Sequence, residues 1–295
     1  MENERKFLCL DSLALKIIAA LLMTVDHIGL LFISNDTAGE FYLIYSILRS
    51  FGKLAFPLFA FLAVEGAYNS KNIVKYLIRL LVLSIILDVF GFVIGAVANL
   101  SIASNPVIGN AFTDLFLGVL TITLLRKRNW FSLFALLPIA YALLSRLYIN
   151  DSWGYLFKTD WGAFSIILFL FYFFARELVN AYLKNKAISD GLEKDVYLKN
   201  DSRLYYNLFE GVGLLATEMV FYLLYRFDNF STFLPSEFVP IGTYGTLACV
   251  IFFFYNGKKG FASKKLQYAF YGYYPAHLLI LGIISLFFGV LAVYR

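Results

Sequence analysis

The chain has 295 residues, of which 60% are hydrophobic and only 15% are charged. Together with a mean hydropathy of +0.72, this composition excludes an ordinary soluble domain and predicts an integral membrane protein. The formal charge of +5 is expected to reflect membrane topology and contacts with anionic lipids. Nucleic-acid binding is not predicted, because no other feature of the sequence supports it.

Apolar runs of membrane-spanning length follow one another along the whole chain. The first, LALKIIAALLMTVDHIGLLF, has the roughly 20 residues that a membrane helix needs. It carries charged residues and lacks a small-x-small cleavage site, so we interpret it as a retained helix and not as a signal peptide. The second run is long enough to be bent or tilted at Pro57. After the first run, spans are expected at 41–67, 73–98, 107–125, 130–148, 161–182, 204–226, 238–255 and 271–293.

The fold predicted from these runs is an all-α, polytopic membrane helix bundle of about nine transmembrane helices in a single domain, residues 1–295. Most of the 25 lysines and arginines lie in alternate connecting segments, among them Arg176 and Arg203 in the segment around residues 184–203. Under the positive-inside rule this bias predicts a cytoplasmic N-terminus, an external C-terminus and a short cytoplasmic connector at 184–203. The second span could instead divide into an interfacial helix and a membrane helix.

Both histidines of the chain, His27 and His277, lie inside predicted spans, and Asp26 adjoins the first of them. A charged side chain inside a span costs about 2.5–3.5 kcal/mol on insertion scales, so such residues usually persist for a function. The pattern therefore indicates proton chemistry or binding within the membrane.

Two cations in the second span, Arg49 and Lys53, are four residues apart and share one helix face. Counting inward from the ends of the spans gives them about the depth of Asp26. Since neighbouring residues on a helix point about 100° apart, Asp26 is expected to pair with one of these cations and to leave His27 facing a cavity. An ion-pair network that only joins the two spans would give the same pattern.

Further acidic residues fall within or at the ends of spans. Asp160 opens the sixth predicted span and is expected either to cap that helix or to bind an acceptor. Glu210 and Glu218 are two turns apart and are interpreted as structural, and the tyrosines between 268 and 274 as an interfacial aromatic belt. The acidic candidates for substrate binding are Glu65, Asp88, Asp114 and Asp160.

Six motifs carry a resemblance to the TraX family. They are LALKIIAALLMTVDHIGLLF, GKLAFPLFAFLAVEGAYNSKNIVKYLIRLL, NAFTDLFLGVLTITLL, TDWGAFSIILFLFYF, FFFYNGKKG and LQYAFYGYYPAHLLIL, in this order over nearly the whole chain. The family comprises integral membrane proteins related to the conjugal-transfer protein that acetylates F pilin, and it resembles acyltransferase-3 enzymes. Where the family typically has G-R-x-A-F-P, this chain has Lys53 in place of arginine, which keeps the charge and loses the planar two-pronged donor.

The resemblance implies acyl transfer from cytoplasmic acetyl-CoA, in a bacterial cytoplasmic membrane, to an amine or hydroxyl of a peptide, pilin-like protein, glycan or lipid. His27 would be the general base, and Arg49 or Lys53 would stabilise the oxyanion. His277, expected two turns into the last span and nearer the cytoplasm, would orient the CoA arm or relay a proton. The CoA phosphates would meet basic groups that topology alone could also explain: Lys71, Lys75 and Arg79, with Asn256 and the Lys258–Lys259 pair of YNGKKG.

A proton-coupled transporter or lipid exporter is the alternative, with the same Asp, His and Lys side chains forming a relay. No internal repeat or symmetric helix breaks favour it. Cys9 and Cys249 lie far apart without C-x-x-C partners, so neither a disulfide nor a metal site is predicted.

Overall fold

The computed structural model describes residues 7–33, 40–98, 109–145, 157–191, 202–226, 243–261 and 263–287. Within these ranges the chain is helical, apart from an isolated β-bridge between Leu10 and Tyr255. Five helical stretches are long and apolar enough to cross a membrane, namely Ser12–Phe32, Tyr42–Asn69, Ile73–Val97, Ala163–Ser189 and Ser202–Leu224. The predicted all-α membrane bundle is confirmed.

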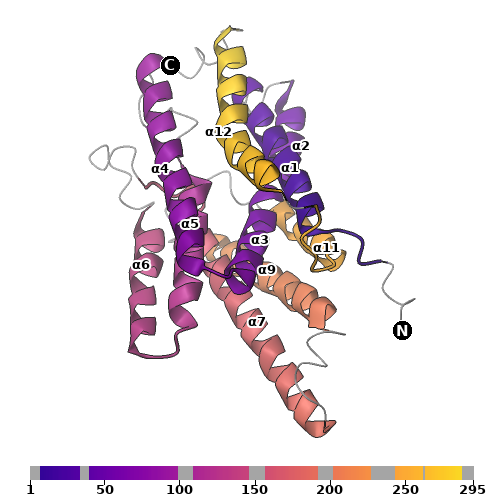
Figure 1. Ribbon diagram of the computed structural model, residues 1–295. Coiled ribbons are helices and arrows are strands. Elements are labelled where there is room, and N and C mark those ends of the chain that lie inside the picture. Colours follow the sequence, from indigo (N-terminus) through magenta and orange to yellow (C-terminus); the bar gives the residue numbers. More distant parts are fainter. Residues whose placement is uncertain are drawn as a thin grey trace.

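Every predicted span contains at least one helix (Figure 1). Two boundaries differ from the prediction: the sixth span continues as a helix to Ser189, into the expected connector, and the last helix begins at Lys264, about two turns early. Residues 192–201 of the connector lie outside the described residues. The elements are α1 (Ser12–Phe32), α2 (Tyr42–Gly52), α3 (Ala55–Asn69), α4 (Ile73–Ala98), α5 (Ala111–Leu125), η1 (Trp130–Ala135), α6 (Leu136–Leu144), α7 (Ala163–Ser189), α9 (Ser202–Arg226), η3 (Thr243–Leu247), α11 (Ala248–Phe253) and α12 (Lys264–Phe287).

The second span breaks between α2 and α3, at Lys53 and Leu54. Pro57 lies in the first turn of α3 and has no N–H to donate to the carbonyl of Lys53, four residues earlier. The bend predicted for this span is therefore confirmed, and the missing hydrogen bond accounts for its position. The break puts Lys53 at a helix end.

Helix α3 lies at the centre of the bundle and is buried on most of its surface. Phe61 stacks on Phe252 of α11, with ring centroids 4.4 Å apart, and Phe56 stacks on Trp161 before α7 at 4.7 Å. Helix α1 packs against α2, α3 and α12, while α7 runs along α9 and α5 lies against α4 and α7. Burial of these apolar and aromatic surfaces holds α3 in place.

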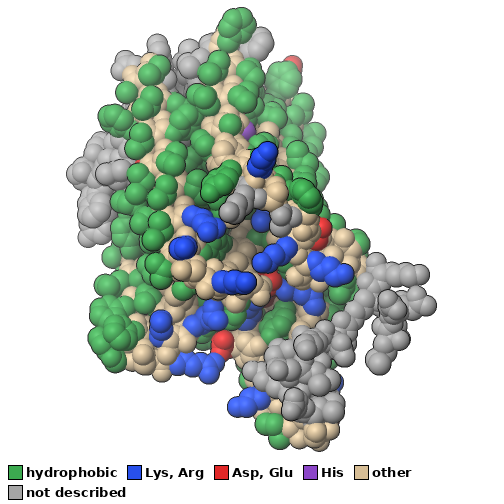
Figure 2. Space-filling view, viewed as in Figure 1, with side chains coloured by type: hydrophobic (Ala, Val, Ile, Leu, Met, Phe, Trp, Pro, Cys, Tyr) green, Lys and Arg blue, Asp and Glu red, His purple; other side chains and the backbone are tan. Residues whose placement is uncertain are grey.

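The outer helices expose apolar side chains. Val82, Ile86 and Val93 on α4 and Ile280 and Ile283 on α12 are about half exposed, as lipid-facing residues would be. Figure 2 shows hydrophobic side chains over the upper part of one face and a band of Lys and Arg side chains below them. Such a band fits the predicted basic side of the membrane, and the orientation itself stays a prediction.

Candidate active site

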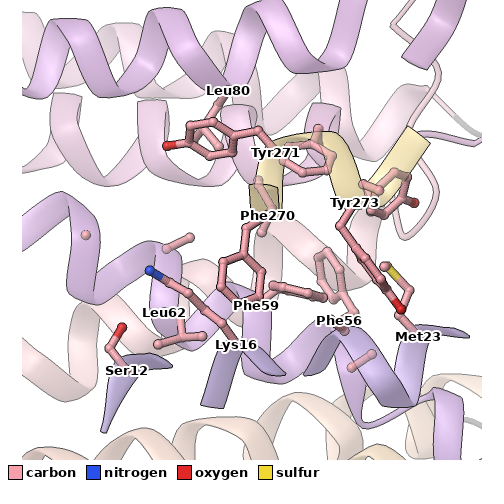
Figure 3. A pocket seen from close by; sticks show the side chains of 18 of the residues that line it. Ser12, Lys16, Met23, Phe56, Phe59, Leu62, Leu80, Phe270, Tyr271 and Tyr273 are labelled. Carbon is pink, nitrogen blue, oxygen red and sulfur yellow. The ribbon is translucent and has the colours of Figure 1, made fainter. Parts of the chain in front are cut away.

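A cavity of about 960 Å³ opens between α1, α3, α4 and α12. It follows α1 from Ser12 to Leu30, which is most of the length of that helix. Figure 3 shows the rings of Phe59 and Phe270 near the Lys16 side chain, with the Tyr271 ring farther along the same space. The four polar residues predicted to converge all line it: Asp26, His27, Arg49 and Lys53.

Asp26 pairs with Arg49, one of the two cations expected from their depth. Arg49 Nη1 lies 2.5 Å from Asp26 Oδ2, and the arginine is buried. Helices α1 and α2 come close here because position 52 is glycine: a Cβ atom on Gly52 would overlap the Asp26 carboxyl. The pair thus depends on a backbone approach that the sequence motif provides.

The two histidines, 250 residues apart in sequence, are in direct contact. His277 Nε2 lies 3.1 Å from His27 Nδ1, and His277 Nδ1 lies 2.9 Å from the carbonyl oxygen of Tyr273. His277 is buried, and its ring stacks on that of Tyr273. The predicted position of His277 nearer the cytoplasm is wrong, because α12 begins at Lys264 and brings His277 to the depth of His27.

These contacts fix the tautomers of the neutral pair. A carbonyl oxygen can only accept, so His277 Nδ1 must carry the hydrogen that it donates to Tyr273. In the neutral ring Nε2 then has no hydrogen and accepts one from His27 Nδ1. His27 Nε2 is consequently the nitrogen with a lone pair available for a proton.

Lys53 and Asp160 line the cavity beside Trp161. Lys53 Nζ lies 5.0 Å from the Trp161 ring centroid, a cation–π distance. Asp160 is exposed, and the residue at the start of α7 is Gly162, which has no side-chain cap. The capping alternative for Asp160 is therefore wrong, which leaves the acceptor-binding alternative as a prediction.

Asp114 holds the start of α7 instead. Its carboxylate accepts hydrogen bonds from the backbone N–H groups of Asp160, Trp161 and Gly162 at 2.8–3.0 Å and from the Ser165 hydroxyl at 2.6 Å. A carboxylate here also complements the helix dipole. Asp114 was predicted to bind substrate, and in the structure its oxygens are engaged by the protein.

Asp88 is likewise engaged, by the Asn110 side chain at 2.8 Å and by the Phe157 N–H at 2.7 Å. These bonds join α4 to the segments that precede α5 and α7. Neither Asp88 nor Asp114 is among the described residues that line the cavity. Both carboxylates position helices around it.

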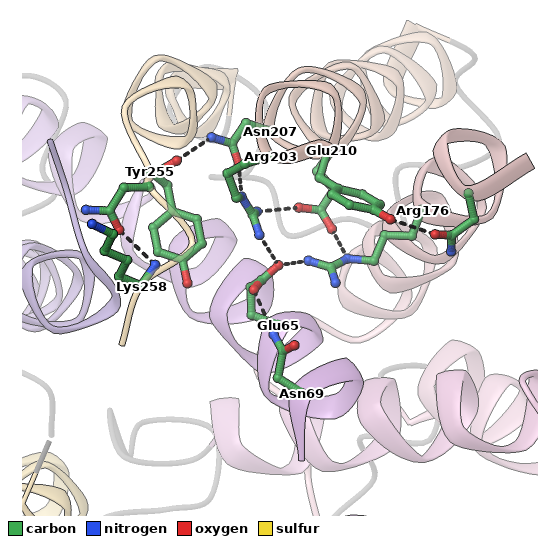
Figure 4. A network of polar contacts seen from close by, with 11 residues as sticks. Glu65, Asn69, Arg176, Arg203, Asn207, Glu210, Tyr255 and Lys258 are labelled. Carbon is green, nitrogen blue, oxygen red and sulfur yellow. Dashed lines mark hydrogen bonds and ion pairs between the residues drawn. The ribbon is translucent and has the colours of Figure 1, made fainter. Parts of the chain in front are cut away.

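Glu65 lines the cavity and also belongs to a buried charge network (Figure 4). Its carboxylate pairs with Arg176 of α7 and, at 2.7 Å, with Arg203 of α9, while Asn69 donates to it at 3.0 Å. Glu210 pairs with both arginines. The assignment of Arg176 to a cytoplasmic segment is wrong, because α7 continues past it and buries it. The interpretation of Glu210 as structural is supported by these pairs.

Of the predicted phosphate ligands, Arg79 lines the cavity. Lys71 and Lys75 are exposed and are not among its lining residues. Asn256 and Lys258 form a turn, in which the Lys258 N–H donates to the Asn256 side chain at 2.8 Å. Lys259 lines the same end of the cavity, as does Lys16, which sequence reasoning placed inside a span and gave no role.

The tyrosines of α12 form a cavity wall. Tyr271, Tyr273 and Tyr274 line the cavity, and the Tyr273 hydroxyl is 2.6 Å from that of Thr24 on α1. Only Tyr268, 69% exposed, has the position expected of an interfacial belt. The belt interpretation is therefore wrong for the other three, because their face of α12 turns toward α1.

Comparison with known proteins gives two matches. The sequence model of the TraX protein family matches residues 12–189, which include α1 to α7. A probable fimbrial assembly protein FimC, serogroup H1, of Dichelobacter nodosus is 30% identical over 271 residues, covering 90% of this chain and 92% of that protein. No solved structure matches the chain.

Proposed function

The chain belongs to the TraX family, and we propose that it is a membrane-bound acyltransferase that uses acetyl-CoA as its acyl donor. The observation that carries the proposal is one cavity containing a histidine with an available ring nitrogen, a buried arginine, a half-buried lysine and an apolar passage. The proposed location is the cytoplasmic membrane of a bacterium. The acceptor is an amine or hydroxyl of a peptide, pilin-like protein, glycan or lipid.

His27 is the proposed general base. Its Nε2 takes the proton of the acceptor amine or hydroxyl while the acceptor nitrogen or oxygen bonds to the thioester carbon. The carbon–sulfur bond then breaks, and His27 returns the proton to the departing sulfur, which leaves as a thiol. His27 is neutral before and after this sequence, so the atoms and charges balance.

Arg49 and Lys53 are suited to stabilise the charge that develops on the carbonyl oxygen. Fixed cations inside a protein act more strongly than in bulk solvent, because the surrounding dielectric constant is lower. Asp26 holds Arg49 by its 2.5 Å ion pair, and the Trp161 ring lies beside Lys53. These contacts restrict the two cations before substrate arrives, which lowers the cost of reorganisation.

The cavity changes character along its length. Ser12, Asn72 and Lys259 line one end, and Met23 and Phe59 belong to an apolar middle section. Asp26, His27 and Asp160 line the other end. This order suits an acyl donor with a polar anionic body, a long flexible arm and a terminal thioester.

The proposal is tested with purified protein in detergent and acetyl-CoA labelled in the acetyl group. We expect release of free CoA thiol and transfer of label to a supplied peptide amine, glycan hydroxyl or lipid head group. His27→Ala should lower the rate by about 10²–10⁴-fold, the usual contribution of a general base, with CoA binding retained. Near-normal turnover in folded His27→Ala would refute the assignment. Proton-coupled flux in proteoliposomes without thiol release would favour the transporter alternative.

A further inference from the structure

We propose that Lys16, Arg79 and Lys259 form the binding site for the phosphate groups of the donor, at the polar end of the cavity. This inference rests on the proposed function for the identity of the donor. The three residues come from α1, α4 and the turn after α11, and all three line the cavity. Arg79 and Lys259 are among the basic residues that the sequence predicts for this role, and Lys16 is added by the structure.

These three cations have no ion-pair partner among the described residues. Glu65, a carboxylate that shares the cavity lining, pairs with Arg176 and Arg203. Asp11, close to Gly260, accepts the Ala14 N–H as the N-cap of α1. Glu65 is thus neutralised by its arginines, and Asp11 forms no ion pair with Lys16, Arg79 or Lys259 among the described residues. Three cations against the one carboxylate of Asp11 leave this end of the cavity with net positive charge.

Lys16 and Lys259 lie close enough for their charges to interact. Two like charges that face one space without an acidic partner repel each other, and a bound anion would remove that repulsion. Lys16 lies in the second turn of a membrane-spanning helix, where a charge is costly unless it has a function. Side chains that can donate hydrogen bonds line the same region, among them Ser12, Asn72, Ser263 and Gln267.

The spacing suits a donor that reaches His27. Lys16 and His27 are eleven residues apart on α1, which corresponds to about 16 Å along a helix axis. The cavity between them has an apolar lining that can hold a flexible arm, formed by Ala20, Met23, Phe59 and Phe270. A group with phosphates at Lys16 would thus place the far end of an extended arm near the histidine.

The backbone holds this end of the cavity together. The Asn256 N–H donates to the Leu10 carbonyl, and the Ser12 N–H donates to the Lys258 carbonyl, both at 2.8 Å. These bonds tie the turn after α11 to the start of α1. These bonds involve backbone atoms, so a substitution at Lys16 or Lys259 should leave the turn intact.

The experiment compares equilibrium binding of CoA with that of pantetheine, which lacks the nucleotide and its phosphates, to protein in nanodiscs. Lys16→Gln, Arg79→Gln and Lys259→Gln should each weaken CoA binding by about tenfold or more, as expected for a charge-assisted contact. Pantetheine binding should not change. Lys75→Gln and Lys258→Gln are matched controls, one turn from Arg79 and adjacent to Lys259 respectively, and should bind CoA normally.

The proposal is overturned if the control variants weaken CoA binding as much as the three cavity variants do, or if pantetheine binds wild-type protein as tightly as CoA. It is also overturned if CoA binding persists in Lys16→Gln while co-purifying phosphatidylglycerol is lost, since the cations would then serve a lipid head group. The binding assay also separates this site from the proposed function. If the wild-type protein transfers no acyl group but the three cavity variants still lose CoA binding selectively, the proposed function is contradicted and this site is supported.

Discussion

The Asp26–Arg49 pair beside the two histidines and the network of Glu65, Arg176, Arg203 and Glu210 are both buried groups of charge in one bundle. In the network, two carboxylates and two guanidinium groups neutralise each other, and two side-chain amides bond to them. The pair at α1 lines the cavity. Among the described residues, Asp26 Oδ1 in the pair and Glu210 Oε2 in the network are both buried without a hydrogen-bond partner.

This difference separates a structural cluster from a candidate reactive one. Burial of charge alone is no guide, because both groups are buried and both join helices. What distinguishes the cavity group is that Asp26, Arg49 and the neighbouring His27 all line a space large enough for a ligand, whereas Glu65 is the one member of the network that does. Variants should accordingly affect stability in one cluster and turnover in the other.

The largest expected effect is on stability, at Arg176. Arg176→Ala would leave the two buried carboxylates of Glu65 and Glu210 with Arg203 as the one cation of the network that pairs with them. Removing one partner of a buried pair typically costs about 3–5 kcal/mol. Thermal unfolding in detergent should show a marked loss of stability. An unchanged unfolding temperature would show that water reaches this network and that it is not a structural cluster.

In the cavity cluster, Asp26→Asn should mainly affect turnover. The asparagine keeps the shape beside Gly52 but no longer holds Arg49 by charge, and a misplacement of about 1 Å can cost about 10²-fold in rate. We expect kcat for acetyl transfer to fall by about that factor, with a smaller stability loss than in Arg176→Ala. If the unfolding temperatures of the two variants fall equally, the contrast between the clusters is not valid.

Hydropathy and depth are enough to predict the helices and the pairing of Asp26 with either Arg49 or Lys53, of which the structure selects Arg49. Both depend on local length along a span, which a sequence displays directly. The errors arose where an interaction is long-range. Asp114, and not the adjacent Asp160, holds the start of α7 because the carboxylate comes from another helix, and no spacing within the segment reveals this.

Helix ends were a second source of error. The segment before Tyr271 contains polar residues such as Gln267 and two lysines, which lower its hydropathy although it is helical. The predicted span begins at residue 271 and therefore places His277 nearer the membrane surface than His27. The structure begins α12 at Lys264, which brings the two histidines to the same depth and into contact. Arg176 lies inside the predicted span 161–182, but a charge near the predicted end of a span is normally counted with the flanking loop.

The contact between the histidines gives a prediction that follows from their tautomers. His277→Gln keeps an acceptor for the His27 Nδ1 hydrogen, whereas His277→Ala removes it. We expect the alanine variant to lose about tenfold or more in kcat, less than His27→Ala, and the glutamine variant to recover much of the rate. Nitrogen NMR of labelled His27 should report the Nδ1–H tautomer in wild type and a mixture in His277→Ala.

Equal rates in His277→Ala and His277→Gln would mean that His277 acts through packing alone. An unaltered His27 tautomer in His277→Ala would likewise show that His277 acts through packing alone. Tyr273→Phe is a suitable control, because it removes the hydroxyl near Thr24 while keeping both the ring stacked on His277 and the backbone carbonyl that binds it.

The smallest expected effect concerns Lys53, the half-buried cation of the cavity cluster. Lys53→Arg keeps the charge over the Trp161 ring, and a guanidinium can stack on that ring as well as an ammonium does. We therefore expect transfer within about threefold of wild type, because a cation–π contact of this kind is worth about 0.5–1 kcal/mol and is kept.

Lys53→Met retains the length of the side chain but not the charge, and it should lower kcat by about tenfold if Lys53 stabilises the oxyanion. The comparison is measured as kcat at saturating acetyl-CoA, with KM as the control for donor binding. A methionine variant as active as the arginine variant would remove Lys53 from the reactive cluster and leave Arg49 as its cation.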